Sequence, residues 1–181
     1  AALNRWLNRR SIFFFLGAAA HRLLGRDIAR RQIIASLAGR SREQLAAAAR
    51  RYVREDLPNS ANHDLHDRLQ AHKAAGDRVI LLSSSIDLVV SEIASQLGVE
   101  CRSSTLEFRN ERCTGRLSSD LTGRKPMAIQ GMLAPRTSLW VYTDNRSDLE
   151  LVKMADKATI VIPKGRQNAR WAGGDCEYVR L

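Results

Sequence analysis

The stretch "SLWVYTDNRSDLEL", residues 138–151, joins a short apolar segment to two acidic residues. Residues 139–142 are apolar or aromatic and favour burial in a strand, and Asp144 follows just beyond them. Asp148 comes about one helical turn after Asp144. Two carboxylates this close repel each other unless a cation or a solvated helix cap relieves the repulsion. The stretch therefore predicts a buried strand that ends in either a divalent-cation site or an ordinary helix cap.

Helical and strand patterns alternate outward from this stretch. A continuous apolar run predicts a strand covered on both faces, and apolar residues at helical spacing predict helices between the strands. The predicted elements are helices over 3–25, 27–39, 41–56 and 63–76, a strand over 78–85, a helix over 86–98, a hairpin over 104–117, a helix over 124–133, a strand over 138–144, a helix over 146–155 and a last strand over 158–163. This order predicts an α/β fold with a Rossmann-like parallel sheet core.

The beginning of the chain differs from the rest in having no strand pattern. We therefore expect an N-terminal helical cap domain over residues 1–60 and the α/β core over residues 61–181, with a linker near residues 59–64. Ser41 and Gln44 have the spacing of a capping box, in which each side chain bonds the other residue's backbone N–H.

Positive charge is concentrated in the first part of the chain. The formal net charge is +10, and residues 1–78 carry fifteen Lys/Arg against seven Asp/Glu. Such a surface attracts phosphate-bearing ligands, nucleic acid or an anionic membrane, but a solvated arginine-rich helical face explains it equally simply. We expect no nucleic-acid partner. The apolar run at residues 11–20 is about half of a bilayer span. It predicts a buried helix face, with an interfacial helix over residues 3–20 as the alternative.

Cysteine usage bears on the compartment. Cys101, Cys113 and Cys176 are odd in number and do not have the spacing of metal ligands. This usage favours a reducing, cytoplasmic environment over a disulfide-stabilised secreted fold.

Two further groups of polar residues fall at the ends of predicted elements. Ser83 ends a predicted strand, and Ser84 and Ser85 lead into the next helix. Hydroxyls and free N–H groups at a helix start form an anion site, although a serine there can also be a simple N-cap. Lys125 stands at a helix start, where its ammonium can neutralise a phosphate. Since ligands of parallel sheets bind beyond the carboxyl ends of the strands, we expect these residues to share one edge.

In this order, the motifs make the chain resemble the haloacid dehalogenase superfamily, and within it the phosphoserine-phosphatase-like branch with a helical cap. "RVILLSSSIDLVVSEIASQLGVE" resembles the second motif of that branch and its helix, and "STLEFRNERCTGRL" resembles its hairpin. "TGRKPMAI" is similar to the third motif and "VYTDNRSDLELV" to the fourth. The resemblance covers about residues 41–165.

The resemblance implies a phosphomonoester hydrolase that uses Mg²⁺ and an aspartyl-phosphate intermediate. Ser83 and the N–H of Ser84 would bind the phosphoryl oxygens, and Lys125 would act in catalysis by neutralising the phosphate and the nucleophile. This assignment suits phosphoryl transfer, which depends mostly on positioning and charge neutralisation.

The same resemblance implies the metal ligands. Asp144 would bind Mg²⁺ directly. Asp148 would hold either the metal's ligand shell or Lys125, and Asn145 would support that shell.

One part of the family pattern is absent from the sequence. The first motif, Asp-x-Asp-x-Thr at the end of the first strand, does not occur in these 181 residues. Its strand would be central in the sheet, and a sheet without it would expose unpaired backbone groups. We therefore expect the nucleophile upstream of residue 1, in a longer polypeptide, and expect the 181 residues by themselves to have no phosphatase activity.

Two alternatives of different kinds stay open at this point. One is a catalytically inactive binding module of the same fold. The other is a membrane-surface enzyme that acts on a lipid phosphate. We expect the partner to be a small phosphorylated substrate, and serine-phosphate-like monoesters, histidinol phosphate and lipid phosphates all fit the resemblance.

Overall fold

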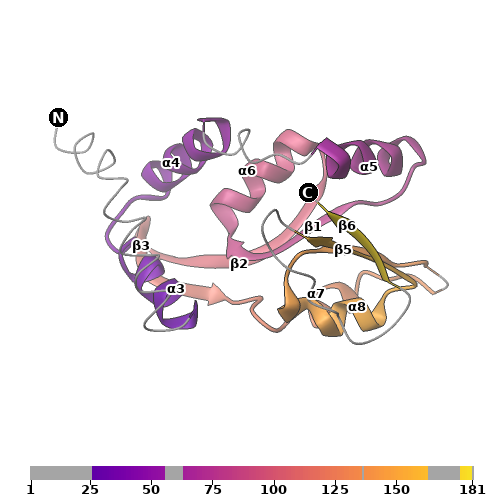
Figure 1. The fold of residues 1–181 in the computed structure, drawn as a ribbon. Helices are drawn as coiled ribbons and strands as arrows, with labels where there is room; N and C mark the ends of the chain where they lie inside the picture. The colour runs from indigo at the N-terminus through magenta and orange to yellow at the C-terminus, as the bar shows by residue number, and fades with distance from the viewer. Residues whose placement is uncertain (1–25, 56–62, 136, 163–175, 181) are drawn as a thin grey trace. The chain divides into compact units, whose positions relative to one another are not determined.

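The computed structural model describes residues 26–55, 63–135, 137–162 and 176–180 (Figure 1). The elements are α3 (Arg26–Ala35), α4 (Arg42–Glu55), α5 (His63–Ala74), β1 (Ile80–Ile86), α6 (Asp87–Leu97), β2 (Glu100–Arg109), β3 (Arg112–Ser119), α7 (Lys125–Gln130), β4 (Trp140–Thr143), the 3₁₀ helix η2 (Arg146–Asp148), α8 (Leu149–Met154), β5 (Lys157–Ile162) and β6 (Cys176–Arg180). The predicted α/β class is confirmed. The proposed interfacial helix over residues 3–20 lies outside the described residues.

The strands form two three-stranded sheets, β1–β2–β3 and β4–β5–β6. β1 pairs in parallel with β2, which forms an antiparallel hairpin with β3. β4, β5 and β6 are all parallel. Within the described ranges, none of the helices has the length and apolar character that a membrane span requires.

Strand β1 is less covered than the sequence predicts. Its apolar residues are only half-buried, although their continuous run predicts a strand covered on both faces. The reason is its position, because in the described part of the chain β2 is the only strand that pairs with β1. β4 is likewise the edge strand of its own sheet. An edge strand offers backbone N–H and C=O groups to a further strand.

The prediction that the strand over 158–163 is the last one is wrong. β6 follows it and pairs in parallel with β5, from Ala158 opposite Cys176 to Ile162 opposite Arg180. Only five residues form β6, and it lies at the edge of its sheet. A short edge strand needs little apolar content, and its sequence signal is correspondingly weak.

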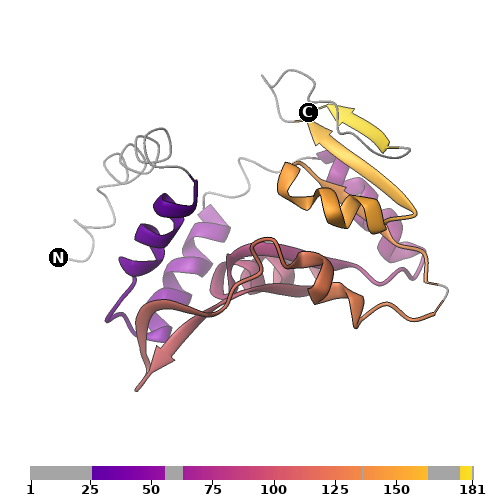
Figure 2. The same ribbon diagram turned by 90° about the horizontal axis from the view of Figure 1, so that it is seen from below.

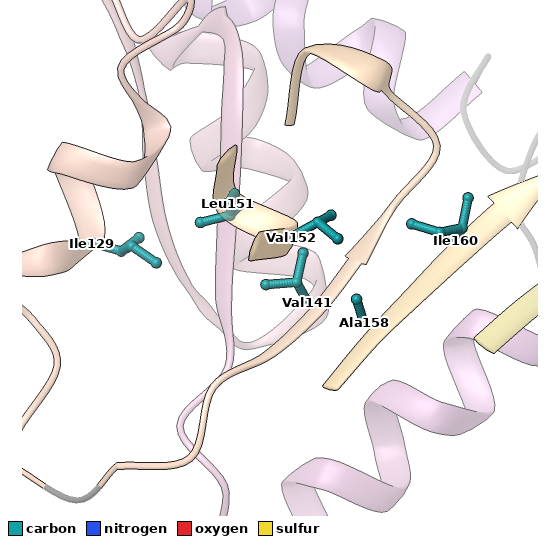
Figure 3. Close-up of a cluster of buried hydrophobic side chains, with 6 residues drawn as sticks. All are labelled: Ile129, Val141, Leu151, Val152, Ala158 and Ile160. Carbon is teal, nitrogen blue, oxygen red and sulfur yellow. The ribbon is translucent and has the colours of Figure 1, made fainter. Parts of the chain in front are cut away.

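One face of the β4–β6 sheet is covered by α7 and α8. An apolar cluster fills the layer between them (Figure 3), and its Ile160 is only 1% exposed. The cluster consists of Ile129 from α7, Val141 from β4, Leu151 and Val152 from α8, and Ala158 and Ile160 from β5. Leu82 of β1 packs against it. The ends of β1, α7 and β4 are therefore fixed around one core.

Helix α5 contacts the same sheet through polar side chains. Arg68 forms a two-pronged ion pair with Glu177 of β6, with N–O distances of 2.6 and 3.0 Å. His72 bonds the Tyr142 hydroxyl of β4 at 2.8 Å and the Asp77 carboxylate at 2.7 Å. The helix contains no fully buried residue. Its attachment thus depends on hydrogen bonds and ion pairs more than on apolar burial.

The predicted hairpin and capping box are both confirmed. The chain of β2 and β3 forms the predicted hairpin (Figure 2). Its turn residues, Asn110 and Glu111, have φ angles of 48° and 61°, which match the two-residue turns that suit twisted strands. The Ser41 N–H donates to Gln44 Oε1 and the Gln44 N–H donates to Ser41 Oγ, each at 3.1 Å. The chain just before α4 also pairs with β3, because the Gly39 N–H donates to the Cys113 carbonyl at 2.8 Å.

Contacts along the chain define two compact units. The first contains residues 1–48 and 105–119, and the second contains residues 49–104 and 120–181. All the predicted site residues belong to the second unit. The division into a cap over residues 1–60 and a core over residues 61–181 stays a prediction.

We expect Ile160→Ala to lower the free energy of unfolding by about 2–5 kcal/mol, because it leaves a cavity in the most buried part of the α7–α8 core. Urea denaturation followed by circular dichroism measures the change. Met154→Ala on α8 is the control, since Met154 is 39% exposed and its loss should cost less than about 1 kcal/mol. Equal losses in the two variants would contradict this description of the core.

The Arg68–Glu177 pair predicts a pH effect. Hydrogen bonding to Arg68 lowers the pKa of Glu177 below its usual 4.5. A lowered carboxyl pKa stabilises the fold above the usual value, and this stabilisation is lost as the pH falls through the lowered one. In Arg68→Gln, carbon-detected NMR titration should show the Glu177 pKa returning upward. Lys153→Gln, which removes the partner of Glu150 instead, should leave it unchanged.

Candidate active site

The end of β4 presents one open carboxylate. Asp144 is exposed, and in the part of the chain that the structure describes it makes no hydrogen bond or ion pair. The cap of η2 is Asn145, whose Oδ1 accepts the Ser147 N–H at 3.2 Å. Asp148 stands at the N-cap position of α8 but makes no capping bond there. Helix capping therefore does not explain either acid, although the sequence left that interpretation open.

A buried ion pair lies beside this open carboxylate. Lys125 Nζ and Asp148 Oδ2 are 2.7 Å apart, and the two side chains are only 13% and 6% exposed. The Thr143 hydroxyl donates to the same oxygen at 2.8 Å. A carboxylate that is taken out of water needs such partners, because an unpaired buried charge is costly. The resemblance allowed Asp148 either to hold the metal's ligand shell or to hold Lys125, and the structure shows the contact with Lys125.

The local sequence explains why Lys125 reaches Asp148. Lys125 is the first residue of α7 and is followed by Pro126, which favours a helix start because its missing N–H needs no partner there. Gly123, with a φ of 67°, lets the chain turn into the helix. Ile129 then anchors α7 in the core beside α8. The lysine is thus held at the N-terminal end of one short helix and directed at the start of another.

Near the end of β1 the serines lie in an irregular part of the strand. The pairing with β2 is in register up to Ser83 and resumes at Ile86, so the ladder is irregular at Ser84 and Ser85. Ser83 Oγ accepts the Ser85 N–H at 3.1 Å. The N-cap of α6 is Ile86, and it makes no side-chain capping bond. The serines are therefore not the cap of α6, which was the alternative to an anion site.

The structure brings some of the predicted residues into direct contact and links others indirectly. Lys125 and Asp148 touch, and Asp144 directly follows Thr143, the last residue of β4, whose hydroxyl donates to Asp148. The Ser84 carbonyl is linked to the loop before Lys125 through the Ser104 hydroxyl, which also accepts the Leu121 N–H. Thr143 was missed by sequence reasoning. Its signal was a hydroxyl at the last position of a buried strand.

The donor set fits Mg²⁺ only in part. Mg²⁺ binds through one or two carboxylates, keeps several waters and takes phosphate oxygens as ligands. Asp144 is a free carboxylate of that kind, whereas Asp148 already accepts bonds from Lys125 and Thr143. In the described ranges there is no group of three or more His, Cys, Asp and Glu that would enclose a metal.

Comparison with known proteins assigns this arrangement to a family. Residues 2–153 match the family described as haloacid dehalogenase-like hydrolase. The chain belongs to this family. A search of curated protein sequences found no significant match.

Solved structures show that the fold is shared. A protein of unknown function from Bordetella pertussis Tohama I is 22% identical over 80% of this chain and 70% of that one, with a TM-score of 0.68. A phospho-aspartyl intermediate analogue of phosphoserine phosphatase is 16% identical over 74% and 64%, with a TM-score of 0.53. A probable phosphoserine phosphatase from Vibrio cholerae is 16% identical over 79% and 44%, with a TM-score of 0.57. The chain thus spans less than two thirds of the length of these two phosphatases.

The buried ion pair makes a prediction about stability. Asp148→Ala should lower the free energy of unfolding by about 3 kcal/mol, because it leaves the Lys125 ammonium buried without its partner. The double variant Lys125→Met/Asp148→Ala should recover part of this loss. Urea denaturation of the complete double-mutant cycle measures the coupling.

The matched control for this cycle is the Lys153–Glu150 pair of α8, which has nearly the same N–O distance of 2.8 Å but side chains 52% and 69% exposed. Its coupling should not exceed about 0.5 kcal/mol. A Lys125–Asp148 coupling as small as that of the control would mean that burial does not strengthen the pair.

Proposed function

We propose that this hydrolase is a Mg²⁺-dependent phosphomonoester hydrolase of small phosphorylated substrates. The observation that carries the proposal is the buried Lys125–Asp148 pair next to the open carboxylate of Asp144 at the end of β4. A fixed ammonium and a free carboxylate are what a phosphate dianion and a divalent cation need on the two sides of one site. The solved phosphoserine phosphatases with the same fold lend support.

In this proposal each residue acts through its observed contacts. Asp148, which accepts the Thr143 hydroxyl, holds the Lys125 ammonium, and this ammonium faces the negative charge of the phosphate. Ser83 and the Ser84 N–H bind phosphoryl oxygens. The irregular pairing of β1 with β2 between Ser83 and Ile86 supports that role, since bulges of this kind re-aim side chains and backbone groups.

The Mg²⁺ ligand in this chain is Asp144, and Asn145 and Asp148 lie in the surrounding shell. Asn145 keeps the loop in place by accepting the Ser147 N–H. When bound, the cation neutralises charge on the phosphate and orients it. The exposed position of Asp144, with no partner in the described ranges, supports this assignment.

The nucleophile is proposed to be an aspartate upstream of residue 1. Its carboxylate oxygen forms a bond to phosphorus while the ester P–O bond breaks, and the leaving oxygen takes a proton. Water then attacks the phosphorus of the aspartyl phosphate, which releases inorganic phosphate and restores the carboxylate. The edges of β1 and β4 support the idea of a further strand, since both lie beside one core without being paired to each other.

Phosphate release from a panel of phosphomonoesters, with and without Mg²⁺, tests the proposal. The 181-residue chain is compared with the polypeptide extended upstream to include the next strand. We expect turnover only in the extended form and only with Mg²⁺. An extended form that carries an Asp-x-Asp motif and still hydrolyses no phosphomonoester would contradict the proposed function and favour an inactive binding module.

In the extended polypeptide, Asp144→Asn should lower turnover by about 100-fold or more and raise the Mg²⁺ concentration needed for half-maximal rate, because a carboxamide is a poorer ligand for a hard cation. Asp67→Asn is the control, because Asp67 is an exposed acid on α5. Unchanged Mg²⁺ dependence in Asp144→Asn would remove the metal role from this residue.

A further inference from the structure

Ser104 lies at a junction between the two loops that carry the proposed phosphate-binding groups. It is 0% exposed and is the last β2 residue before the β2–β3 hairpin pairing begins at Thr105. On one side of it the β1 ladder is interrupted between Ser83 and Ile86. On the other side β3 ends at Ser119, so Asp120 already belongs to the next loop. Ile86, the last residue of β1, pairs with Ser104 directly after this irregularity, whereas β3 ends opposite Thr105.

The Ser104 hydroxyl bonds the segments on both sides of β2. It donates to the Ser84 carbonyl at 2.9 Å, with Asp120 Oδ1 as a longer second acceptor at 3.3 Å. It also accepts the Leu121 N–H at 3.0 Å. Asp120 Oδ1 in turn accepts the Thr122 N–H at 2.9 Å. The buried hydroxyl of Ser104 thus joins the last part of β1, at Ser84, to the loop that leads into Lys125.

We propose that Ser104 is a positioning residue that fixes the proposed phosphate-binding segment, Ser83 and Ser84, relative to Lys125. This inference rests on the phosphatase function proposed above and deepens it. Ser83 lies in β1 and Lys125 begins α7, and among the described residues no hydrogen bond joins these two side chains, so a group that bonds both segments can set their spacing. A hydroxyl that donates to one loop and accepts from the other sets that spacing, and burial strengthens both bonds because water does not compete for them.

The position of Ser104 also explains why a small hydroxyl residue is needed. Ser84 and Ser85 lie in an irregularity of the β1–β2 ladder, where the strand pairing is locally disrupted. The Ser104 hydroxyl provides a hydrogen bond to the Ser84 carbonyl at this point. An alanine at this position would remove the hydrogen bonds that the Ser104 hydroxyl makes to the Ser84 carbonyl and to the Leu121 N–H.

The test compares Ser104→Ala with two controls in the 181-residue chain. Ser118→Ala removes a hydroxyl-to-carbonyl bond in the hairpin, to Thr105 at 3.3 Å, outside both loops. Ile160→Val reduces overall stability without touching either loop. NMR follows amide hydrogen exchange at Ser85 and Thr122, because neither of these amides bonds Ser104 itself.

The measured ratio is the exchange rate of the Ser85 or Thr122 amide divided by that of amides in β5. We expect Ser104→Ala to raise this ratio about tenfold at both amides, and we expect both controls to leave it unchanged. Titration with inorganic phosphate and Mg²⁺, followed by the same amide signals, should show affinity about tenfold weaker in Ser104→Ala only. Asp120→Asn keeps the Oδ1 acceptor and should retain the wild-type exchange ratio, whereas Asp120→Ala should not.

Faster exchange at Thr122 with no change at Ser85, or the same phosphate affinity in Ser104→Ala as in wild type, would overturn the positioning role. Failure of the proposed function has a different signature. In that case the wild-type chain shows no phosphate-dependent shifts and the extended polypeptide no hydrolysis, while the exchange ratios still report whether Ser104 joins the two loops.

Discussion

The buried pair between Lys125 and Asp148 is the interaction on which the candidate site depends. An ammonium and a carboxylate this far from water persist only when they face each other and when further hydrogen bonds satisfy the acid, which Thr143 provides. That requirement fixes the start of α7 against the start of α8. It also leaves the carboxylate of Asp144, a few residues away, as the one in that loop that is open to a ligand.

Much of the fold was accessible from local patterns in the sequence. The capping box of Ser41 and Gln44, the hairpin turn at Asn110 and Glu111, and the order of strands and helices in the core depend on neighbouring residues, and all three appear in the structure. Lys125 and the two acids were also identified from their positions at element ends. Their contact is long-range, and the family resemblance suggested it only as one of two roles for Asp148.

The features that the sequence did not predict depend on pairing between distant segments. Whether an apolar run such as that of β1 is covered on both faces is decided by its neighbours in the sheet, and β1 has one in the described ranges. β6 is short and lies at an edge, so its pattern is weak. Thr143 and Ser104 are ordinary hydroxyl residues in sequence. Their roles come from hydrogen bonds to segments that are distant or irregular: the Ser104 hydroxyl donates to the Ser84 carbonyl, and the Thr143 hydroxyl donates to the Asp148 carboxylate.

The polar attachment of α5 has a consequence for how the molecule opens. Since no residue of that helix is fully buried, its separation from the sheet exposes little apolar surface. Such a local opening carries a small heat-capacity change and a small urea dependence, unlike cooperative unfolding of the core. Ionic strength acts on it more strongly, because exposed ion pairs such as Arg68–Glu177 are screened by salt. In amide exchange measured at low urea concentration, α5 should therefore behave as the salt-sensitive part of the second unit.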